Sequence, residues 1–256
     1  MKLVFGEGSC GIAAGAENVR QALLAQDLGG AAHIRERFPD LPVHASTQMT
    51  VFGPDGAGLL KELGVKRVVL PRELSLQEIE AVSQVLETEV FIHGALCYCY
   101  SGQCLMSSFL GGRSGNRGRC AQPCRKPFEG DFLMNMRDLC ALPRLPEVLR
   151  AGASSLKIEG RMKSPLYTYG VVSIYRRYLD RIEAGEEPKA EKEDLAFLSS
   201  LFDRGGFTDG YFTGENMGFT QDDKLCVCVP LFHCFGVVLA TMNCLTHGCT
   251  EVMVEK

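Results

Sequence analysis

Short runs of apolar and β-branched residues alternate along the chain with segments of helical periodicity. This alternation predicts strands joined by crossover helices, and therefore a mostly parallel sheet with helices packed on it. The fold class is α/β. The expected strands are Ala22–Gln26, Pro42–Ser46, Arg67–Leu70, Glu89–His93, Phe132–Asn135 and Ser155–Ile158.

Helix signals lie between these strands. Pro54–Leu63 is amphipathic and is followed by Gly64, a residue that commonly ends a helix. Ser75 and Glu78 have the spacing of a capping box, so a helix is expected to start there. Ser164–Pro165 is a typical N-cap with a proline in the first turn, which predicts the start of another helix.

The character of the sequence changes after Gly214, where Val, Cys, Phe and Thr occur without helical period. We therefore expect two parts. Residues 1–212 should form a partial (β/α) domain that carries a cysteine-rich loop within residues 89–140. Before the boundary, the charged stretch Glu186–Asp194 should lead into one more helix that ends near Asp203. Residues 213–256 should be the start of a small β module.

Composition narrows the functional class. The 256 residues are 46% hydrophobic and 23% charged, which is typical of a globular protein. A net charge of −4 argues against a chain that is basic throughout, although not against a local basic patch. Met1–Gly15 lacks the apolar core of a signal peptide, and no apolar run reaches the ~18 residues of a spanning helix. We therefore predict a cytoplasmic protein without a membrane partner.

Twelve cysteines in a cytoplasmic chain indicate metal ligands or catalytic thiols rather than disulfides. Cys97, Cys104, Cys120 and Cys124 lie in one glycine-rich segment, and Cys140 follows soon after. Between Val90 and Phe128 there are arginines and a lysine but no acidic residue. Cationic surroundings lower the pKa of thiols and offset the charge of a thiolate cluster.

Four thiolates in this setting favour an iron–sulfur cluster or a zinc site. The paired C-x-x-C units typical of zinc are absent from the segment. The simplest alternative is that the cysteines are small buried apolar residues, but core cysteines rarely gather in a glycine-rich loop. His93 precedes Cys97 by four residues, so a Cys–His nucleophile pair is a further alternative.

One run of residues resembles the signature of peptidase family U32, the collagenase-like family: Glu89-x-Phe91-x-x-Gly94-Ala95-Leu96-Cys97, followed by Gly102-x-Cys104-x-Met106-Ser107. The signature has many fixed positions, so the resemblance is specific, and it extends from about Ala22 to Gly214. Further similar segments are His44–Thr50, Gly112–Arg125, Arg137–Cys140 and Ser155–Pro165.

The resemblance implies a (β/α) TIM-barrel-like fold. Family members usually begin with two further strand–helix units, and nothing similar precedes Ala22, so the barrel is expected to be incomplete at the N-terminus. Several members are iron–sulfur proteins that hydroxylate RNA bases or a quinone precursor without O₂. In the RNA-modifying members, prephenate is the implied hydroxyl source.

The resemblance also implies a ligand set for a 4Fe–4S cluster. Cys97, Cys104 and Cys120 are the expected ligands, with Cys124 or Cys140 as the fourth. Spacing favours Cys124, because three residues separate it from Cys120. Cys140 is preferred here, because it follows the expected strand Phe132–Asn135 and could reach the same rim from the next unit.

Other charged residues fall at the expected strand ends, where a barrel places its active site. Arginine can hold a carboxylate or phosphate through two parallel hydrogen bonds. A solvated set of salt bridges is the structural alternative. The candidate catalytic residues are His93, Lys157, Glu159 and Arg161, and the candidate substrate-binding residues are Arg72, Arg113, Arg117, Arg119 and Arg125.

These observations predict an iron–sulfur-dependent hydroxylase of a base in tRNA or rRNA, with prephenate or a similar small carboxylate as co-substrate. A collagenase-like peptidase that depends on a thiol or a metal is the first alternative. An iron–sulfur subunit of an O₂-independent quinone-precursor hydroxylase is the second. The oligomeric state is left open by the sequence.

Overall fold

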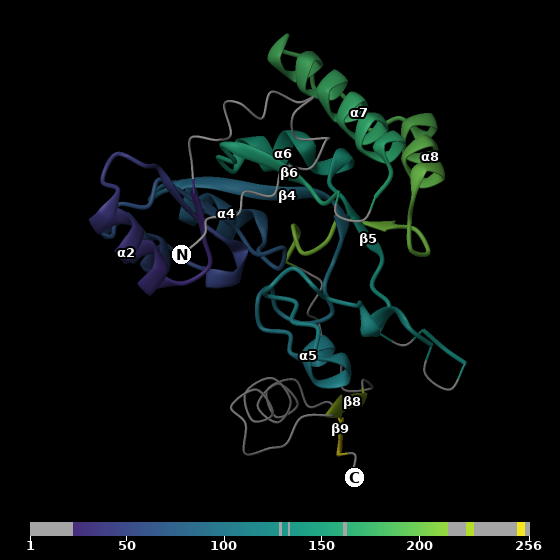
Figure 1. Cartoon of the computed structure of the whole chain (residues 1–256). Coiled ribbons are helices and arrows are strands. Elements are labelled where there is room, and N and C mark those ends of the chain that lie inside the picture. The colour runs from purple at the N-terminus through teal and green to yellow at the C-terminus, as the bar shows by residue number, and fades with distance from the viewer. Residues whose placement is uncertain are drawn as a thin grey trace. The chain divides into compact units, whose positions relative to one another are not determined.

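A computed structural model describes residues 23–127, 130–132, 134–160, 163–214, 224–227 and 250–253. The chain divides into two compact units, Met1–Thr213 and Gly214–Lys256. The first unit contains the main sheet, its helices and the cysteine-rich segment (Figure 1). In the second unit, two short strands, β8 (Lys224–Val227) and β9 (Thr250–Met253), pair in parallel. No helix among the described residues is long and apolar enough to cross a membrane.

Five strands of the first unit form a continuous parallel ladder, as the alternation of apolar runs and helices predicts. Each strand pairs with the next along the series, so the successive crossovers place their carboxyl ends at one edge. Five of the six expected strands are thereby confirmed. In ladder order they are β1 (Leu23–Ala25), β2 (Val43–Ala45), β3 (Arg67–Val69), β4 (Glu87–Ala95) and β6 (Ser155–Ile158).

The helices begin where their capping residues indicate. The Ser75 side chain accepts from the backbone N–H of Glu78, and the Glu78 carboxylate accepts from the Ser75 N–H at 2.7 Å. Ser164 Oγ accepts from the backbone N–H of Tyr167 at 3.1 Å. Both sites satisfy N–H groups that the first turn leaves without helical partners. The helices are α2 (Leu28–Arg37), α3 (Pro54–Glu62), α4 (Leu76–Ser83), α5 (Met106–Gly111), α6 (Leu145–Arg150), α7 (Pro165–Glu183) and α8 (Lys192–Leu201).

The expected strand Phe132–Asn135 is wrong. The strand in this region is β5 (Asp138–Cys140), which runs antiparallel to the end of β4 and pairs on its other edge with β7 (Phe207–Thr208). Asp138 is almost fully buried on this strand because Arg204 forms an ion pair with it at 2.7 Å. An acidic residue inside a strand conceals the strand from hydrophobic patterning, since its partner is remote in sequence.

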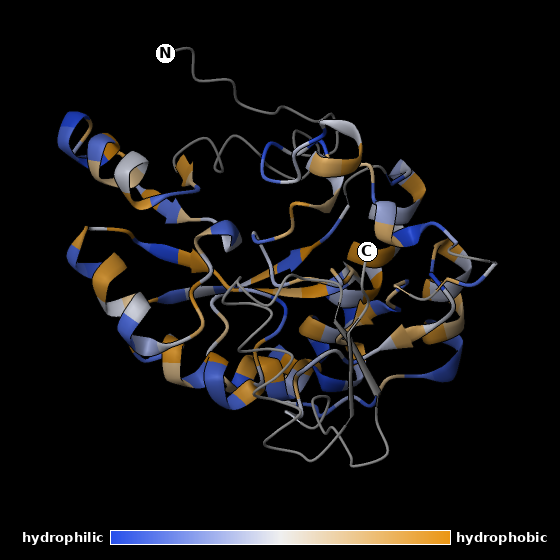
Figure 2. Cartoon of the chain, turned by 90° about the horizontal axis from the view of Figure 1, so that it is seen from below, coloured by the Kyte–Doolittle hydropathy of each residue, from blue (hydrophilic) through white to orange (hydrophobic). Residues whose placement is uncertain are grey.

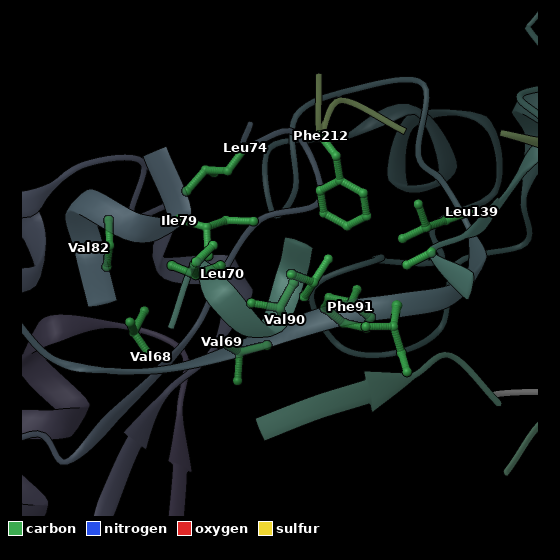
Figure 3. Close-up of a cluster of buried hydrophobic side chains, with 14 of the residues drawn as sticks. Val68, Val69, Leu70, Leu74, Ile79, Val82, Val90, Phe91, Leu139 and Phe212 are labelled. Carbon is green, nitrogen blue, oxygen red and sulfur yellow. The ribbon is translucent and has the colours of Figure 1, made fainter. Parts of the chain in front are cut away.

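The core lies between the sheet and its helices. In Figure 3, Leu74 and the α4 residues Ile79 and Val82 lie over residues such as Leu70, which directly follows β3. Phe212, from the segment after β7, closes this cluster, and its carbonyl accepts from the backbone N–H of Leu76 at 3.0 Å. Figure 2 shows the interleaved hydrophobic and hydrophilic residues of the helices, as amphipathic helices on a sheet require.

The sheet is mixed but mostly parallel, which is compatible with a TIM-barrel-like fold. Its strand path runs from β1 to β7, and no pairing among the described residues joins the two ends. Parallel α/β proteins place their functional sites at the carboxyl ends of the strands, so a site is expected at this edge of the sheet.

Candidate functional site

The cysteine loop, residues 96–137, leaves the sheet at the carboxyl end of β4. The segments that follow β2 and β3 both contact it. Gln48, after β2, donates through Nε2 to the Asn116 carbonyl at 3.2 Å. Glu73, after β3, accepts from both N and Oγ of Ser101 at 3.1 Å. Three successive strand ends therefore meet at the loop, as the parallel topology predicts.

Two glycines permit the close approach of backbone at this rim. Gly102 has a φ of 82°, and a Cβ built on it would lie 2.7 Å from the Cα of Gln48. Gly94 has a φ of 110°, and its Cβ would lie 2.9 Å from the Glu159 carbonyl oxygen. A side chain at position 102 would push the loop away from the segment after β2, and one at position 94 would push β4 away from the segment after β6.

The loop thiols lie within electrostatic reach of one another. Cys97 is exposed, and Cys99, Cys104, Cys120 and Cys124 are partly exposed. Loss of hydration raises the pKa of the Cys124 thiol, Arg125 lowers this pKa, and Cys120 and Cys104 raise it further. The pKa of Cys97 is also raised by loss of hydration, then lowered by Arg72, with Cys124 among its neighbours. Cys124 is therefore close enough to each of the three expected ligands, Cys97, Cys104 and Cys120, for their charges to interact.

Cys104 and Cys120 approach each other across Gly115. A Cβ on this glycine would lie 3.8 Å from Cys120 Cβ and 3.9 Å from the Cys104 carbonyl. The backbone N–H of Gln122 points at Cys120 Sγ, with an N···S distance of 3.3 Å. Such N–H groups stabilise a thiolate and tune a cluster bound to it.

The donor chemistry fits an iron–sulfur cluster. No three His, Cys, Asp or Glu side chains in the described part of the chain are placed to hold a single metal ion. A four-iron cluster does not require its ligands to be as close together as a single ion does. Each thiolate binds a different iron, so the ligand sulfurs stand farther apart. Cys97, Cys104, Cys120 and Cys124 supply four thiols from one loop without a competing carboxylate in it between residues 96 and 127.

Cys140 has a different environment. It is buried on β5, and its Sγ lies 3.8 Å from the Tyr175 hydroxyl of α7. Burial raises the pKa of its thiol, and the groups that act on it are the Leu142 backbone and Tyr175. No loop cysteine is among them. The structure therefore places Cys140 in the core, apart from the thiols of the cysteine loop.

His93 lies in the same part of the core. Its ring is 1% exposed and contacts Tyr167, Tyr175 and Phe207. The Tyr175 hydroxyl donates to the Ile92 carbonyl at 2.8 Å, so His93 Nδ1 donates to the Tyr175 oxygen at 3.3 Å. Burial lowers the pKa of His93 to about 4, and Lys163 contributes. No described interaction joins this neutral imidazole to Cys97.

Arg125 holds the cysteine loop together. Its guanidinium donates to the Leu96 carbonyl, to the Met136 carbonyl at 2.5 Å and to Asn135 Oδ1 at 2.9 Å. These acceptors lie at the start and at the end of the loop. The Arg125 donors are therefore used inside the protein, and this candidate substrate-binding residue has a structural role.

Two further candidates, Lys157 on β6 and Glu159 just after it, form ion pairs with residues from β4 and from the segment after β3. Lys157 Nζ lies 2.7 Å from Glu89 Oε1, and Ser155 Oγ donates to the other oxygen of Glu89. Glu159 Oε2 lies 2.7 Å from Arg72 Nη2, and the Arg72 guanidinium stacks 3.6 Å above the Phe91 ring. Lys157, Glu159 and Arg72 therefore form salt bridges, which is the structural alternative expected for charges at the strand ends.

Arg113, Arg117 and Arg119 are all exposed on the cysteine loop. Arg113 donates through Nε to the Arg119 carbonyl at 3.0 Å, which leaves the end of its guanidinium toward solvent. Arg161, another candidate, lies outside the described residues.

Two residues at the site were not among the predicted site residues. Glu73 Oε2 is buried without a hydrogen-bond partner among the described atoms, and burial raises the pKa of this carboxyl. The sequence indicates Glu73 only through its position shortly after the expected strand Arg67–Leu70. Burial lowers the pKa of Lys163 to about 8, with Arg204 and Arg125 contributing. Nothing local in the sequence indicates this cluster of cations.

A model of peptidase family U32 matches residues 15–221. This chain belongs to peptidase family U32. The resemblance inferred from the cysteine signature is therefore confirmed. No solved structure matches the chain significantly.

Family U32 relatives with curated names differ in their described activities. The chain is 38% identical over 204 residues to the 23S rRNA 5-hydroxycytidine C2501 synthase of Escherichia coli, covering 75% of this chain and 29% of the relative. It is 31% identical to the tRNA hydroxylation protein P of E. coli, covering 79% of this chain and 56% of that protein. It is 29% identical to a collagenase of Porphyromonas gingivalis, covering 77% of this chain and 53% of the collagenase. The chain thus spans less than two thirds of the length of each of these U32 relatives.

Proposed function

We propose that this U32 chain is the cluster-binding part of an iron–sulfur-dependent hydroxylase that acts on a base of tRNA or rRNA. One observation carries the proposal: exposed Arg113, Arg117 and Arg119 lie with the four thiols in residues 96–127 of the cysteine loop, which contain no acidic side chain. Arginines of this kind bind phosphates, and the thiols can hold a redox cofactor beside them. The named activities of the rRNA and tRNA relatives support this combination.

We propose Cys97, Cys104, Cys120 and Cys124 as the cluster ligands. The position of Cys124 among the other loop thiols, and of Cys140 beside Tyr175 in the core, favours Cys124 as the fourth. When bound, the cluster would supply one-electron chemistry at the carboxyl edge of the sheet. The chain's own residues hold the loop in place: Arg125 joins its two ends, and Glu73 binds Ser101.

We propose that a small carboxylate such as prephenate is the hydroxyl donor, and that Lys163 contributes to its binding. Lys163 forms no ion pair among the described residues, while Arg72 and Lys157 are each paired with a glutamate. Arg204 and Arg125 lie close enough to lower the pKa of Lys163, and the two nearby carboxylates that raise it, Asp138 and Glu159, are already paired with Arg204 and Arg72. An anion would therefore be stabilised beside Lys163. We propose that this sheet belongs to a TIM-barrel-like fold.

A collagenase-like peptidase is the alternative, favoured by the name of the P. gingivalis relative. A thiol peptidase needs a base within hydrogen-bond reach of the nucleophile. His93, the histidine nearest to Cys97 in the sequence, bonds to Tyr175 in the core instead. The geometry therefore supports the hydroxylase better.

Two measurements test the proposal. The protein is purified without oxygen, and its iron, its acid-labile sulfide and its visible spectrum are measured. In parallel, RNA nucleosides from a deletion strain and from a complemented strain are compared by mass spectrometry. A hydroxylated nucleoside should disappear on deletion and return on complementation with the natural chain or with Cys140→Ser, but not with Cys124→Ser. An unchanged nucleoside profile in the deletion strain contradicts the proposal, and loss of collagen cleavage instead supports the peptidase.

A further inference from the structure

Large apolar side chains are exposed on and around α5 in the cysteine loop. Phe109 is 84% exposed, Leu110 69%, Tyr98 60% and Leu105 54%. A ring as large as that of Phe109 is normally buried unless a partner covers it, because its exposure to water is unfavourable. Tyr98 directly follows Cys97, so one of these rings lies next to an expected cluster ligand.

The exposed arginines belong to the same local structure as these rings. Gly112 ends α5 with a φ of 64°, and the backbone N–H of Arg113 returns to the Ser107 carbonyl at 3.1 Å. The backbone N–H of Ala121 donates to Ser107 Oγ at 2.9 Å. Both ends of the arginine-bearing segment are therefore bonded to α5, which places these arginines beside the helix that carries Phe109 and Leu110.

Charge identifies the partner of this surface. Residues 98–126 contain no acidic side chain, and Arg113, Arg117, Arg119 and Lys126 are exposed. A symmetric contact with a second copy of the chain would place these cations against one another, which is unfavourable. Exposed aromatic rings among cations are the pattern that binds unpaired nucleic acid, since bases stack on rings and phosphates pair with arginine.

We propose that Tyr98 and Phe109 are stacking residues for unpaired RNA bases, and that Arg113, Arg117 and Arg119 bind the phosphates beside them. This inference rests on the proposed function and specifies its substrate: the RNA is bound in a single-stranded loop and not as a duplex. Duplex RNA keeps its bases stacked on each other, so the rings find no free base face. A loop presents such faces and places a nucleotide next to the thiols.

The chain contains no tryptophan, so a single substitution provides a specific optical probe. In Phe109→Trp, indole fluorescence should fall when an RNA hairpin with an unpaired loop is added, and should stay constant with the fully paired duplex. Phe38→Trp is the matched control, because Phe38 is 54% exposed at the end of α2 and is far from the cysteine loop in sequence. Its fluorescence should not respond to either RNA.

Affinity for the same hairpin provides the second measurement. Phe109→Ala should weaken binding about 5- to 150-fold, the loss expected for one stacked base, and should leave the salt dependence unchanged. Arg117→Ala should weaken binding and lower the slope of log affinity against log salt by about 1. Phe38→Ala should bind like the natural chain.

The outcomes separate this inference from the proposed function. If the natural chain binds the hairpin with strong salt dependence, but Phe109→Ala binds equally well and Phe109→Trp is not quenched, the stacking inference is wrong and the proposed function stands. If Phe109→Trp emission changes with protein concentration alone, a second copy covers the rings and the inference is wrong. If deletion of the gene changes no RNA nucleoside, the proposed function itself is wrong.

Discussion

Cys124 in the cysteine loop and Cys140 on β5 are close in sequence, but they occupy opposite environments. Cys124 is partly exposed among other thiols and cations, at the edge where β2, β3 and β4 end. Cys140 is buried beside Tyr175 and His93 beneath α7. In the cysteine loop, the thiols and the exposed arginines are accessible to a ligand. In the core, Cys140 and His93 both contact the Tyr175 hydroxyl, and burial shifts the pKa of each of these three groups toward its neutral form.

This contrast shows that burial, and not residue type, separates the candidate site from the scaffold. His93 and Cys140 have the chemistry of a nucleophile pair, yet both contact the Tyr175 hydroxyl. The cysteine loop is instead held by hydrogen bonds to its backbone, and these keep its thiols in place.

The largest effect is expected for the thiols themselves. Ser substitution of Cys97, Cys104, Cys120 or Cys124 should remove most of the iron, because each loses a thiolate bond to the cluster. Cys140→Ser should keep the iron and the visible spectrum of the natural chain. Iron and sulfide per chain after anaerobic purification measure the difference. Full iron in Cys124→Ser together with loss in Cys140→Ser would reverse the assignment.

Acid should destabilise the core through His93. The folded pKa of about 4 lies below the ordinary 6.5, because burial disfavours the charged imidazole. The unfolded chain therefore binds the extra proton first as pH falls, and stability is lost between pH 6.5 and 4. The loss approaches about 3 kcal/mol when the shift is complete.

Urea unfolding at several pH values between 7.5 and 4 measures this dependence. The pKa of His44 is also lowered, by burial and then by Arg67, so His44→Gln is the matched control. The pH dependence should become weaker in both variants, and much more so in His93→Phe, because the pKa of His93 is lowered all the way to about 4. An equal pH dependence in His93→Phe and in the natural chain would assign the effect to other groups.

Arg125 should stabilise the loop and not the RNA complex. Arg125→Ala removes hydrogen bonds to two carbonyls and to Asn135, which should lower the free energy of unfolding by about 2 kcal/mol. Its iron content should fall as well, because Cys124 is the adjacent residue. Arg119→Ala, at an exposed position, should change neither stability nor iron. Equal stability of the two variants in urea would contradict the structural role.

The smallest effect is expected at Glu73. Glu73→Ala leaves the N–H and hydroxyl of Ser101 without their acceptor, which should cost about 1 kcal/mol. Glu73→Gln retains an acceptor oxygen and should cost less. Amide hydrogen exchange at Ser101 provides the local measurement, and it should be faster in Glu73→Ala than in Glu73→Gln. Unchanged exchange in both would mean that Glu73 does not hold the loop.

Much of the scaffold follows from local sequence. The apolar run Glu89–His93 and the caps at Ser75 and Ser164 predict elements that the structure contains, because strand burial and helix capping depend on a few neighbouring residues. The cysteine signature likewise predicts the family and the segment that carries the site. Both signals are contiguous in the chain.

The tertiary structure decides what the contiguous signals leave open. The buried Asp138 becomes a strand residue only because Arg204 pairs with it from far along the sequence. In the sequence, spacing favours Cys124 and the position after an expected strand favours Cys140, whereas the packing of Tyr175 against Cys140 places Cys140 in the core. The reason is physical: spacing and capping act within a few residues, whereas burial and ion pairing depend on contacts between distant segments, which form only in the folded chain.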